Sequence, residues 1–296
     1  MHIMFLGTSS MVPTKERNQS AVLISCVDES ILVDCGEGTQ RQLKSAGIKL
    51  TSINRILISH WHGDHVLGLP GLIQSMAASG YNRILEIYGP KGSRKRFEDM
   101  FKVFVFDRKI GLSINEVSQG IIFENKDYFI EAGLLEHGIE TLGFSIQEKD
   151  RRKINMAKAK RLGLKEGPLI GKLQMGEEVK IGNKSVKADE VSTVAEGKKI
   201  TIITDTVPCV GADKLAKNAD LLVCEATYDS KLEEKSMEYN HTTAKQAAEM
   251  ANRAGAKKLV LTHFSARYKD TKGLEEEAGT YFSNVQCAYD FMKVNV

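Results

Sequence analysis

The sequence predicts an α/β fold. Short apolar runs rich in Val, Ile and Leu alternate with turn residues and with segments of helical apolar spacing, and acidic or imidazole side chains repeatedly follow the predicted strand ends. The 296 residues suffice for a large core, and 42% hydrophobic and 27% charged residues are typical of a globular protein. No apolar run approaches a membrane span and the N-terminus does not resemble a secretion signal, so we expect no membrane partner.

The first half of the chain predicts strands followed by helices. Three buried strands come first, at residues 3–6, 21–25 and 30–34. Gly36 and Gly38 then mark a turn into a helix at 39–45. Further along the chain, strands and helices alternate: we expect a strand at 55–59, a helix at 67–78, a strand at 85–88 and a helix at 91–106. This alternation favours helices packed against a sheet.

The second half predicts more strands, several of which end at a chemically useful side chain. Hairpin strands are expected at 121–123 and 128–130, further strands at 200–204, 220–224 and 259–262, and an amphipathic helix at 242–254. The residues that follow strand ends are His60, Asp205, Glu225 and His263. Since loops at strand ends converge on a rigid scaffold, we expect a site there.

The segment His-Trp-His-Gly-Asp-His is the most informative part of the chain. It places His60, His62, Asp64 and His65 within six residues, directly after a predicted strand. A single histidine is usually a hydrogen-bonded structural residue, but four ligand-type side chains in this spacing indicate a metal site. Neutral imidazole and carboxylate oxygen are suitable ligands for zinc, and also for manganese or iron.

The remaining ligand-type residues near strand ends suggest a site for two metals. His60, His62 and His137 are candidates for one metal, and Asp64, His65 and His263 for the other, with Asp205 as the bridge. Two cations and a hydroxide suit the hydrolysis of a phosphodiester. The leaving 3′-oxygen needs a proton donor, for which His241 and Glu225 are candidates, one as the donor and one as its orienting partner.

Charge is distributed unevenly along the chain. Residues 149–172 contain nine Lys or Arg and two acids, a formal charge of +7, whereas the whole chain carries +3. This asymmetry favours a polyanionic partner, although a solvated surface loop is the alternative. The five cysteines are scattered and include no Cys-x-x-Cys pair, so we expect a reducing, cytoplasmic location.

Several motifs together resemble a known family. His-x-His-x-Asp-His at 60–65 resembles the signature of the metallo-β-lactamase superfamily, and the chain as a whole resembles the short form of ribonuclease Z, the tRNA 3′-processing endonuclease. The segments that carry this resemblance lie at residues 5–8, 34–42, 60–65, 136–138, 205–206, 225–227, 241–243 and 262–268. The residue before Glu225 is Cys224, where the family has histidine; we expect this departure to affect packing more than catalysis.

The resemblance implies a fold and an assembly. It implies a four-layer αββα sandwich formed by a single domain over residues 1–296, with a protruding, flexible basic arm at 145–195 that binds tRNA. It also implies a homodimer in which the arm of one subunit clamps precursor tRNA over the site of the other. The expected reaction is hydrolysis after the discriminator base, leaving a 3′-hydroxyl on the tRNA and a 5′-phosphate on the trailer.

The resemblance also implies residue roles. Two Zn²⁺ per subunit, or Mn²⁺ or another divalent metal, are expected on the seven ligands His60, His62, Asp64, His65, His137, Asp205 and His263. Asp64 is expected to accept a proton, and Glu225 with His241 to deliver one. Expected substrate-binding residues are Lys15, Arg17, Lys158, Lys160, Arg161, Gly167, Pro168, Lys172 and Arg267. DNA is not an expected partner.

Two other functions remain open at this point. The first is a metal-dependent phosphodiesterase of the same superfamily that acts on small molecules or other RNAs, against which the basic arm argues. The second is a tRNA-binding module with an inactive site, against which the complete set of seven ligands argues.

Overall fold

The computed structural model describes residues 1–105, 109–182 and 184–296, which form two compact units. The larger unit comprises Met1–Ile146 and Lys199–Val296, and the smaller comprises Gln147–Lys198. Within the described residues, no helix has both the length and the apolar character needed to span a bilayer.

The first seven-stranded sheet of the larger unit has the order β18-β1-β2-β3-β4-β5-β6. Its strands are β1 (His2–Gly7), β2 (Ala21–Cys26), β3 (Glu29–Val33), β4 (Ile53–Leu57), β5 (Ile84–Gly89), β6 (Gly111–Glu116) and β18 (Lys293–Asn295). Strands β3 to β6 run parallel. The helices that accompany this sheet are α1 (Thr39–Ser45), α2 (Gly63–Val66), α3 (Leu69–Ala78) and α4 (Ser93–Val103), with a short 3₁₀ turn at Leu50–Ser52.

The second seven-stranded sheet has the order β17-β16-β15-β14-β9-β8-β7. Its strands are β7 (Gly120–Glu124), β8 (Tyr128–Glu136), β9 (Glu140–Glu148), β14 (Lys199–Ile203), β15 (Leu221–Glu225), β16 (Leu259–Thr262) and β17 (Val285–Cys287). Strands β14 to β17 run parallel. Its helices are α8 (Val210–Ala216), α9 (Glu233–Glu238), α10 (Ala244–Ala254) and α11 (Lys272–Gly279), with a 3₁₀ turn at Ser230–Leu232.

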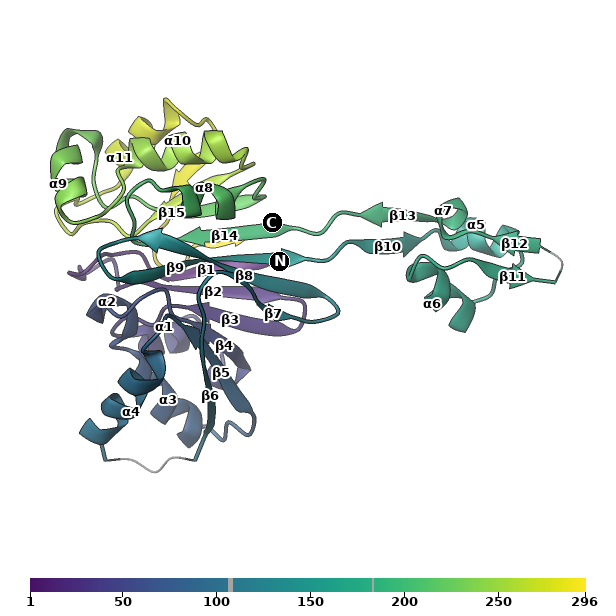
Figure 1. Ribbon diagram of the computed structural model, residues 1–296, viewed down its shortest axis with the longest axis horizontal. Helices are drawn as coiled ribbons and strands as arrows, with labels where there is room; N and C mark the ends of the chain where they lie inside the picture. The colour runs from purple at the N-terminus through teal and green to yellow at the C-terminus, as the bar shows by residue number, and fades with distance from the viewer. Residues whose placement is uncertain (106–108, 183) are drawn as a thin grey trace. The chain divides into compact units, whose positions relative to one another are not determined.

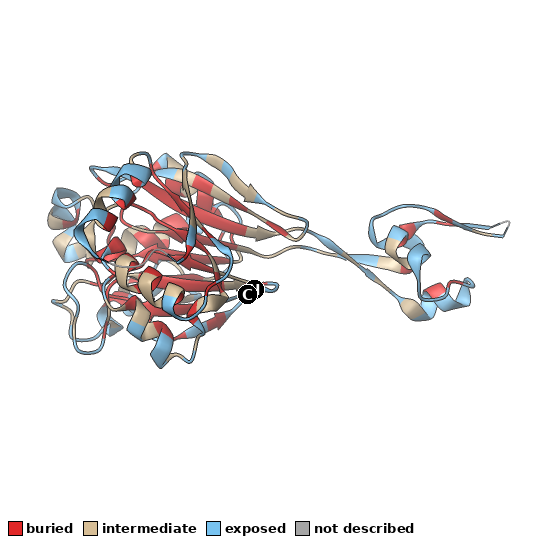
Figure 2. Cartoon of the chain, turned by 90° about the horizontal axis from the view of Figure 1, so that it is seen from below, coloured by how far each residue is buried: buried red, intermediate tan, exposed pale blue. Residues whose placement is uncertain are grey.

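Three hydrophobic clusters give the larger unit four layers. One cluster joins the facing sides of the two sheets, for example Phe5 with Phe144 and Ile202. A second packs α1, α3 and α4 on the first sheet, and a third packs α8, α10 and α11 on the second. Figure 1 shows the helices on the outer sides of the sheets, and Figure 2 shows buried residues gathered along the strands. The predicted α/β fold and αββα sandwich are therefore confirmed.

Some predicted elements have different bounds. The helix predicted at 67–78 is α3, which begins at Leu69, and the turn residues Leu67 and Gly68 separate it from the short α2 at Gly63–Val66. Gly68 packs closely on the preceding loop, since a β-carbon there would lie 2.2 Å from the Gly36 carbonyl oxygen. The strand predicted at 55–59 is Ile53–Leu57. The helix predicted at 91–106 begins at Ser93, after Gly92 at φ 86°, and ends at Val103; residue 106 lies outside the described residues.

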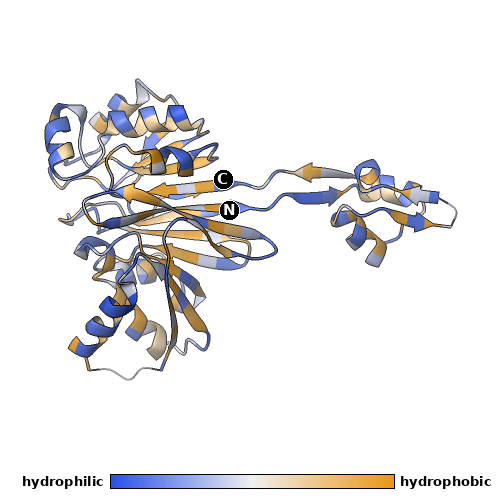
Figure 3. Cartoon of the chain, in the orientation of Figure 1, coloured by the Kyte–Doolittle hydropathy of each residue, from blue (hydrophilic) through white to orange (hydrophobic). Residues whose placement is uncertain are grey.

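The smaller unit has its own small core. It contains β10 (Arg151–Ile154) paired antiparallel with β13 (Ser192–Ala195), the hairpin of β11 (Val179–Ile181) and β12 (Lys184–Val186), and the helices α5 (Met156–Arg161), α6 (Pro168–Gln174) and α7 (Ala188–Val191). Ala159, Leu164, Leu173 and Val191 are almost fully buried together. This basic segment is a folded unit rather than a solvated loop, and Figure 3 shows its mixture of hydrophilic and hydrophobic residues.

Candidate functional site

Four side chains at strand ends form the first candidate metal group. His137 directly follows β8, Asp205 lies two residues after β14, and His60 and His62 follow β4. The Nδ1 of His62 lies 3.1 Å from Nε2 of His60 and 3.2 Å from Nε2 of His137. Asp205 Oδ2 lies 3.6 and 3.5 Å from the same two Nε2 atoms. Tetrahedral zinc with bonds of about 2.0–2.1 Å needs donor atoms about 3.3 Å apart, so the group fits.

A second group shares Asp205 with the first. Asp64 and His65 lie on α2, and His263 directly follows β16. Asp64 Oδ2 lies 3.4 Å from Nε2 of both His65 and His263. Asp205 places Oδ2 3.4 Å from His65 Nε2, and Oδ1 3.3 Å from His263 Nε2. These donor separations again suit a cation with tetrahedral coordination. Asp205 Oδ2 belongs to both groups, as expected of a bridging ligand.

The buried polar atoms of the site also fit metal binding. Among the described residues, Asp64 Oδ1, His65 Nε2 and Asp205 Oδ1 are buried without a hydrogen-bond partner. Leaving such atoms unpaired in a protein interior is costly, so they indicate a ligand that completes the site. The donor set of imidazole nitrogen and carboxylate oxygen suits a divalent metal.

Neighbouring groups orient four of the imidazoles with Nε2 toward the site. The Nδ1 of His60 lies 2.9 Å from Ser59 Oγ, and the Nδ1 of His65 lies 2.7 Å from Asp34 Oδ2. The Nδ1 of His137 lies 2.7 Å from the Asn240 carbonyl oxygen, and the Nδ1 of His263 lies 3.0 Å from Thr227 Oγ1. Such outer partners select the ring tautomer and fix its direction. Asp34 also accepts hydrogen bonds from the Ser59 N–H and hydroxyl, both at 2.8 Å.

The backbone is strained at three of these positions. His263, Asp34 and Asn240 have positive φ angles of 62°, 57° and 56°, which non-glycine residues adopt rarely. One ligand and two orienting residues therefore hold unfavourable conformations that the surrounding fold must enforce. Strain of this kind concentrates at functional sites.

The electrostatics of the site favour a bound cation. Burial, and then the neighbouring His65, hold the pKa of His60 well below its usual range, which leaves a neutral imidazole able to bind metal. Burial raises the pKa of Asp205, but His263 and His65 outweigh burial and keep it well below its ordinary value. Burial lowers the pKa of His65, yet Asp205 and Asp34 outweigh burial and raise it. Asp205 and Asp34 thus stabilise positive charge at this position, and a metal bound there would take the place of the His65 proton.

Glu225 and His241 form a pair beside the metal groups. The His241 Nδ1 lies 3.0 Å from Glu225 Oε1, and the Glu225 side chain is fully buried. Glu225 also accepts hydrogen bonds from the Thr206 N–H at 2.8 Å and the Thr227 hydroxyl at 2.7 Å. Burial lowers the pKa of His241, but Glu225 outweighs it and raises the pKa to about 9. A protonated His241 is therefore available to donate a proton.

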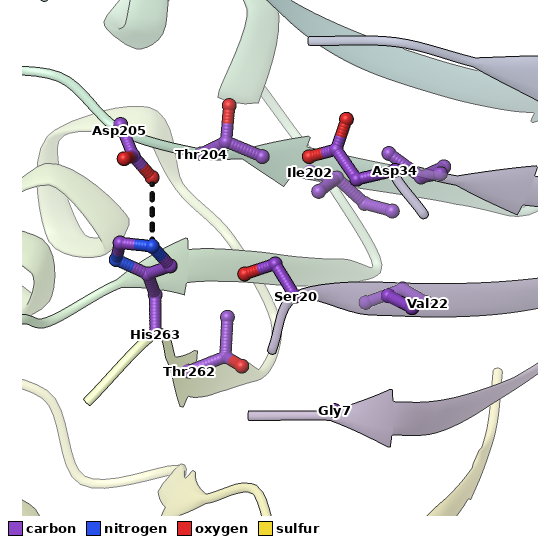
Figure 4. Close-up of a pocket in the computed structure, with 11 residues that line it drawn as sticks. Gly7, Ser20, Val22, Asp34, Ile202, Thr204, Asp205, Thr262 and His263 are labelled. Atoms are coloured by element: carbon purple, nitrogen blue, oxygen red, sulfur yellow. Dashed lines mark ion pairs between the residues drawn. The ribbon is translucent and has the colours of Figure 1, made fainter. Parts of the chain in front are cut away.

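A small cavity lies between the sheets behind this site. Figure 4 shows Asp34, Thr204, Asp205 and His263 among its lining residues. Its volume of about 20 Å³ has room for roughly one water molecule, and excludes a nucleotide. This cavity is therefore too small to be the substrate-binding site.

The residues predicted to bind substrate lie in different surroundings. Lys15 and Arg267 are exposed on the larger unit. Arg17 is only 7% exposed, and its Nη2 donates hydrogen bonds to the carbonyl oxygens of Tyr268 at 2.6 Å and Ser265 at 3.5 Å. The Arg17 side chain thus connects two loops instead of facing solvent. The predicted residues on the smaller unit, all exposed, are Lys158, Lys160, Arg161, Gly167, Pro168 and Lys172.

Cys224 is buried on the side of β15 that faces the helices. It belongs to the cluster that contains Ala247, Ala251 and Leu215 of α10 and α8, whereas the neighbouring Glu225 contacts His241. Burial raises the pKa of the Cys224 thiol well above its usual range, so it stays protonated. Its position accords with a packing role.

Sequence reasoning did not assign roles to Asp34, Ser59, Thr227, Asn240 or Tyr228. Asp34 lies within a segment that carries the family resemblance and directly follows a strand, which is a usable signal. Asn240 acts through its backbone carbonyl, which any residue type supplies. Tyr228 packs beside His241, with ring centroids 6.2 Å apart, and lies under the Arg267 guanidinium, whose carbon is 5.1 Å from the ring centroid.

Comparison with known proteins gives two kinds of relative. A family model described as anti-Pycsar protein Apyc1 matches residues 1–109, a region that contains the 60–65 motif but ends before His137. Ribonuclease Z of Methanothermobacter thermautotrophicus is 41% identical over 297 residues, covering 100% of this chain and 97% of the relative. Ribonuclease Z of Bacillus cereus is 40% identical, covering 98% and 97%.

Solved structures agree in fold. The short form of human tRNase Z matches with a TM-score of 0.74 at 29% identity, covering 100% of this chain and 99% of that chain. The metallo-β-lactamase fold protein YhfI of Bacillus subtilis matches with a TM-score of 0.72 at 18% identity, covering 99% and 98%, a likeness that shows the fold alone.

Proposed function

The chain belongs to the ribonuclease Z family of hydrolytic tRNA endonucleases, and we propose that it removes the 3′ trailer of precursor tRNA at a two-metal centre. Cleavage falls after the discriminator base and leaves a 3′-hydroxyl on the tRNA and a 5′-phosphate on the trailer. The observation that carries the proposal is the pair of ligand groups that share Asp205 Oδ2, each with donor separations suited to one divalent metal.

The seven ligands divide between two metals in this proposal. His60, His62 and His137 hold one, Asp64, His65 and His263 hold the other, and Asp205 bridges them. Bound metals supply an activated water at neutral pH and neutralise charge on the phosphate. Zinc fits the donor chemistry, and manganese or another divalent metal is an alternative.

The chain's own side chains move the protons. Asp64 directs Oδ2 toward His65 and His263, which leaves the buried, unpaired Oδ1 to accept a proton from the attacking water. On the leaving side, Nε2 of His241 donates a proton to the 3′-oxygen, because Nδ1 is engaged by Glu225. Glu225 orients the ring and stabilises its charged form.

Substrate binding uses both units. We assign phosphate contacts to the exposed Lys15 and Arg267 of the larger unit, with Arg17 holding the loop that carries Arg267. The smaller unit, with 13 Lys or Arg against 8 Asp or Glu, contributes Lys158, Lys160, Arg161, Lys172 and the Gly167–Pro168 turn. These contacts bind the RNA backbone and so add affinity without reading sequence.

The proposal extends to the assembly and location of the enzyme. We infer a cytoplasmic homodimer in which the smaller unit of one subunit, as a flexible arm, serves the site of the other. Sedimentation of the purified protein at micromolar concentration tests this: a dimer mass is expected, and a monomer that still cleaves precursor tRNA would contradict it.

Cleavage of a precursor tRNA that carries a 3′ trailer tests the proposed function. With the metal-loaded enzyme, we expect one cut directly after the discriminator base, abolished by a chelator and restored by Zn²⁺ or Mn²⁺. A preparation that holds two metals and hydrolyses a small chromogenic phosphodiester, but leaves the precursor intact, would instead favour a phosphodiesterase with another substrate.

A further inference from the structure

We propose that Tyr228 is a positioning residue that holds the Arg267 guanidinium for the phosphate immediately 5′ of the scissile one. The inference rests on the proposed function and adds a subsite to it. The Arg267 guanidinium carbon lies 5.1 Å from the centroid of the Tyr228 ring, within the range of a cation–π contact. Tyr228 is only 8% exposed, so the ring is a fixed platform, whereas Arg267 is exposed to an incoming ligand.

The same ring connects Arg267 to the proton donor. Tyr228 and His241 form an edge-type contact with centroids 6.2 Å apart. The Tyr228 carbonyl accepts the Ala244 N–H at 2.9 Å, which ties this loop to the start of α10, three residues after His241. The Tyr228 ring therefore contacts both the leaving-group proton donor and the guanidinium, and its backbone carbonyl holds the loop beside α10.

The segment that bears Arg267 is held from two other directions. Arg17 donates a hydrogen bond to the Tyr268 carbonyl at 2.6 Å, and the Tyr268 hydroxyl accepts the Asp229 N–H at 2.9 Å. Arg267 Nε donates to Ser265 Oγ at 3.1 Å, which leaves the terminal nitrogens for a ligand. Within the described residues, no carboxylate forms an ion pair with Arg267.

The direction of cleavage identifies the phosphate. His241 protonates the 3′-oxygen that remains on the tRNA, so groups beside His241 face the tRNA side of the scissile bond and not the trailer. The nearest anion on that side is the phosphate that precedes the discriminator nucleotide. A guanidinium suits it because its planar donors bind phosphate oxygens in pairs.

The test combines enzyme variants with a modified RNA. One precursor has normal phosphates, and the other carries an uncharged methylphosphonate at the position 5′ of the discriminator nucleotide. With the normal RNA, Arg267→Gln is expected to raise KM roughly 10- to 100-fold, because one charge-assisted hydrogen bond to the RNA is removed. Tyr228→Leu is expected to raise KM about 2- to 5-fold, and Tyr228→Phe, which keeps the ring, to restore the wild-type KM.

With the methylphosphonate RNA, the wild-type KM is expected to rise and the Arg267→Gln and Tyr228→Leu variants to lose most of their further effect. Tyr281→Leu is the matched control, because Tyr281 carries a similar contact with Lys245, 5.5 Å from its ring centroid. Equal losses for Tyr228→Leu on both RNAs, or no rescue by Tyr228→Phe in a variant that retains two metals, would overturn the proposal. Failure of the wild-type enzyme to cut either RNA would instead count against the proposed function.

Discussion

Asp34 Oδ2 lies 2.7 Å from Nδ1 of His65, and the same carboxylate binds both the N–H and the hydroxyl of Ser59. Ser59 Oγ in turn lies 2.9 Å from Nδ1 of His60. Asp34, a buried residue with a positive φ angle, thus orients one ligand of each metal group. It contacts His65 of the second group directly and His60 of the first group through Ser59. Asp34 is therefore the structural link between the two halves of the centre.

We predict that Asp34→Ala weakens metal binding at both positions. Loss of an outer-shell partner typically lowers metal affinity about 10- to 100-fold, because the ligand ring is no longer held in its productive tautomer and direction. Competition with a chromogenic chelator measures the two affinities. Asp28→Ala, in the exposed turn between β2 and β3, is the control. Unchanged affinities in Asp34→Ala would show that the ring orientations do not depend on this carboxylate.

Replacing a ligand of only one group should remove only one metal. We expect His65→Ala to bind about one metal per chain in place of about two, and to lose precursor cleavage, because the second group keeps only Asp64, His263 and the shared Asp205. Binding of precursor tRNA should remain within a few-fold of wild type. Elemental analysis and a filter-binding assay measure these quantities, with the exposed His2→Ala as control. Full turnover by His65→Ala would refute the assignment of two catalytic metals.

The Glu225–His241 pair predicts a pH effect. A proton donor is active only while protonated, so kcat should fall as the pH rises above the pKa of His241. Glu225 raises that pKa to about 9, and Glu225→Gln removes the charge that raises it. The variant should therefore lose kcat about 100-fold, and its alkaline fall should begin at lower pH. A pH–rate profile tests this, with Glu238→Gln on α9 as the control. If the alkaline fall of Glu225→Gln began at the same pH as in the wild type, Glu225 would not have this role.

The metal ligands were predictable because their chemistry is visible in their residue types and positions. His60, Asp205 and His263 follow strands whose apolar runs are plain in the sequence, and parallel strands bring such ends together. The residues that orient the ligands could not be predicted in the same way, because they meet their partners only after the chain has folded. Asp34 and His65 are separated by 31 positions, and Asn240 contributes a backbone oxygen.

The internal fold of the smaller unit also could not be predicted from the sequence. Its core uses few and irregularly spaced side chains, such as Ala159, Leu164 and Leu173, and its strands are three or four residues long. Periodicity over so short a span cannot separate helix from strand or loop. The charge of the segment was visible, but the packing that makes it a folded unit was not.

The smaller unit should contribute affinity and not chemistry. Lys158, Lys160 and Arg161 are exposed residues of α5. We predict that replacing all three with Gln raises the dissociation constant for precursor tRNA. The logarithm of the binding constant falls with the logarithm of salt concentration, and the magnitude of this negative slope should decrease by about 0.7–0.9 for each phosphate that is no longer neutralised, because fewer counterions are released. Hydrolysis of a small phosphodiester should persist. Replacing Lys180, Lys184 and Lys187 with Gln removes the same charge elsewhere in the unit; equal effects of the two triple variants would indicate bulk charge in place of a defined binding surface along α5.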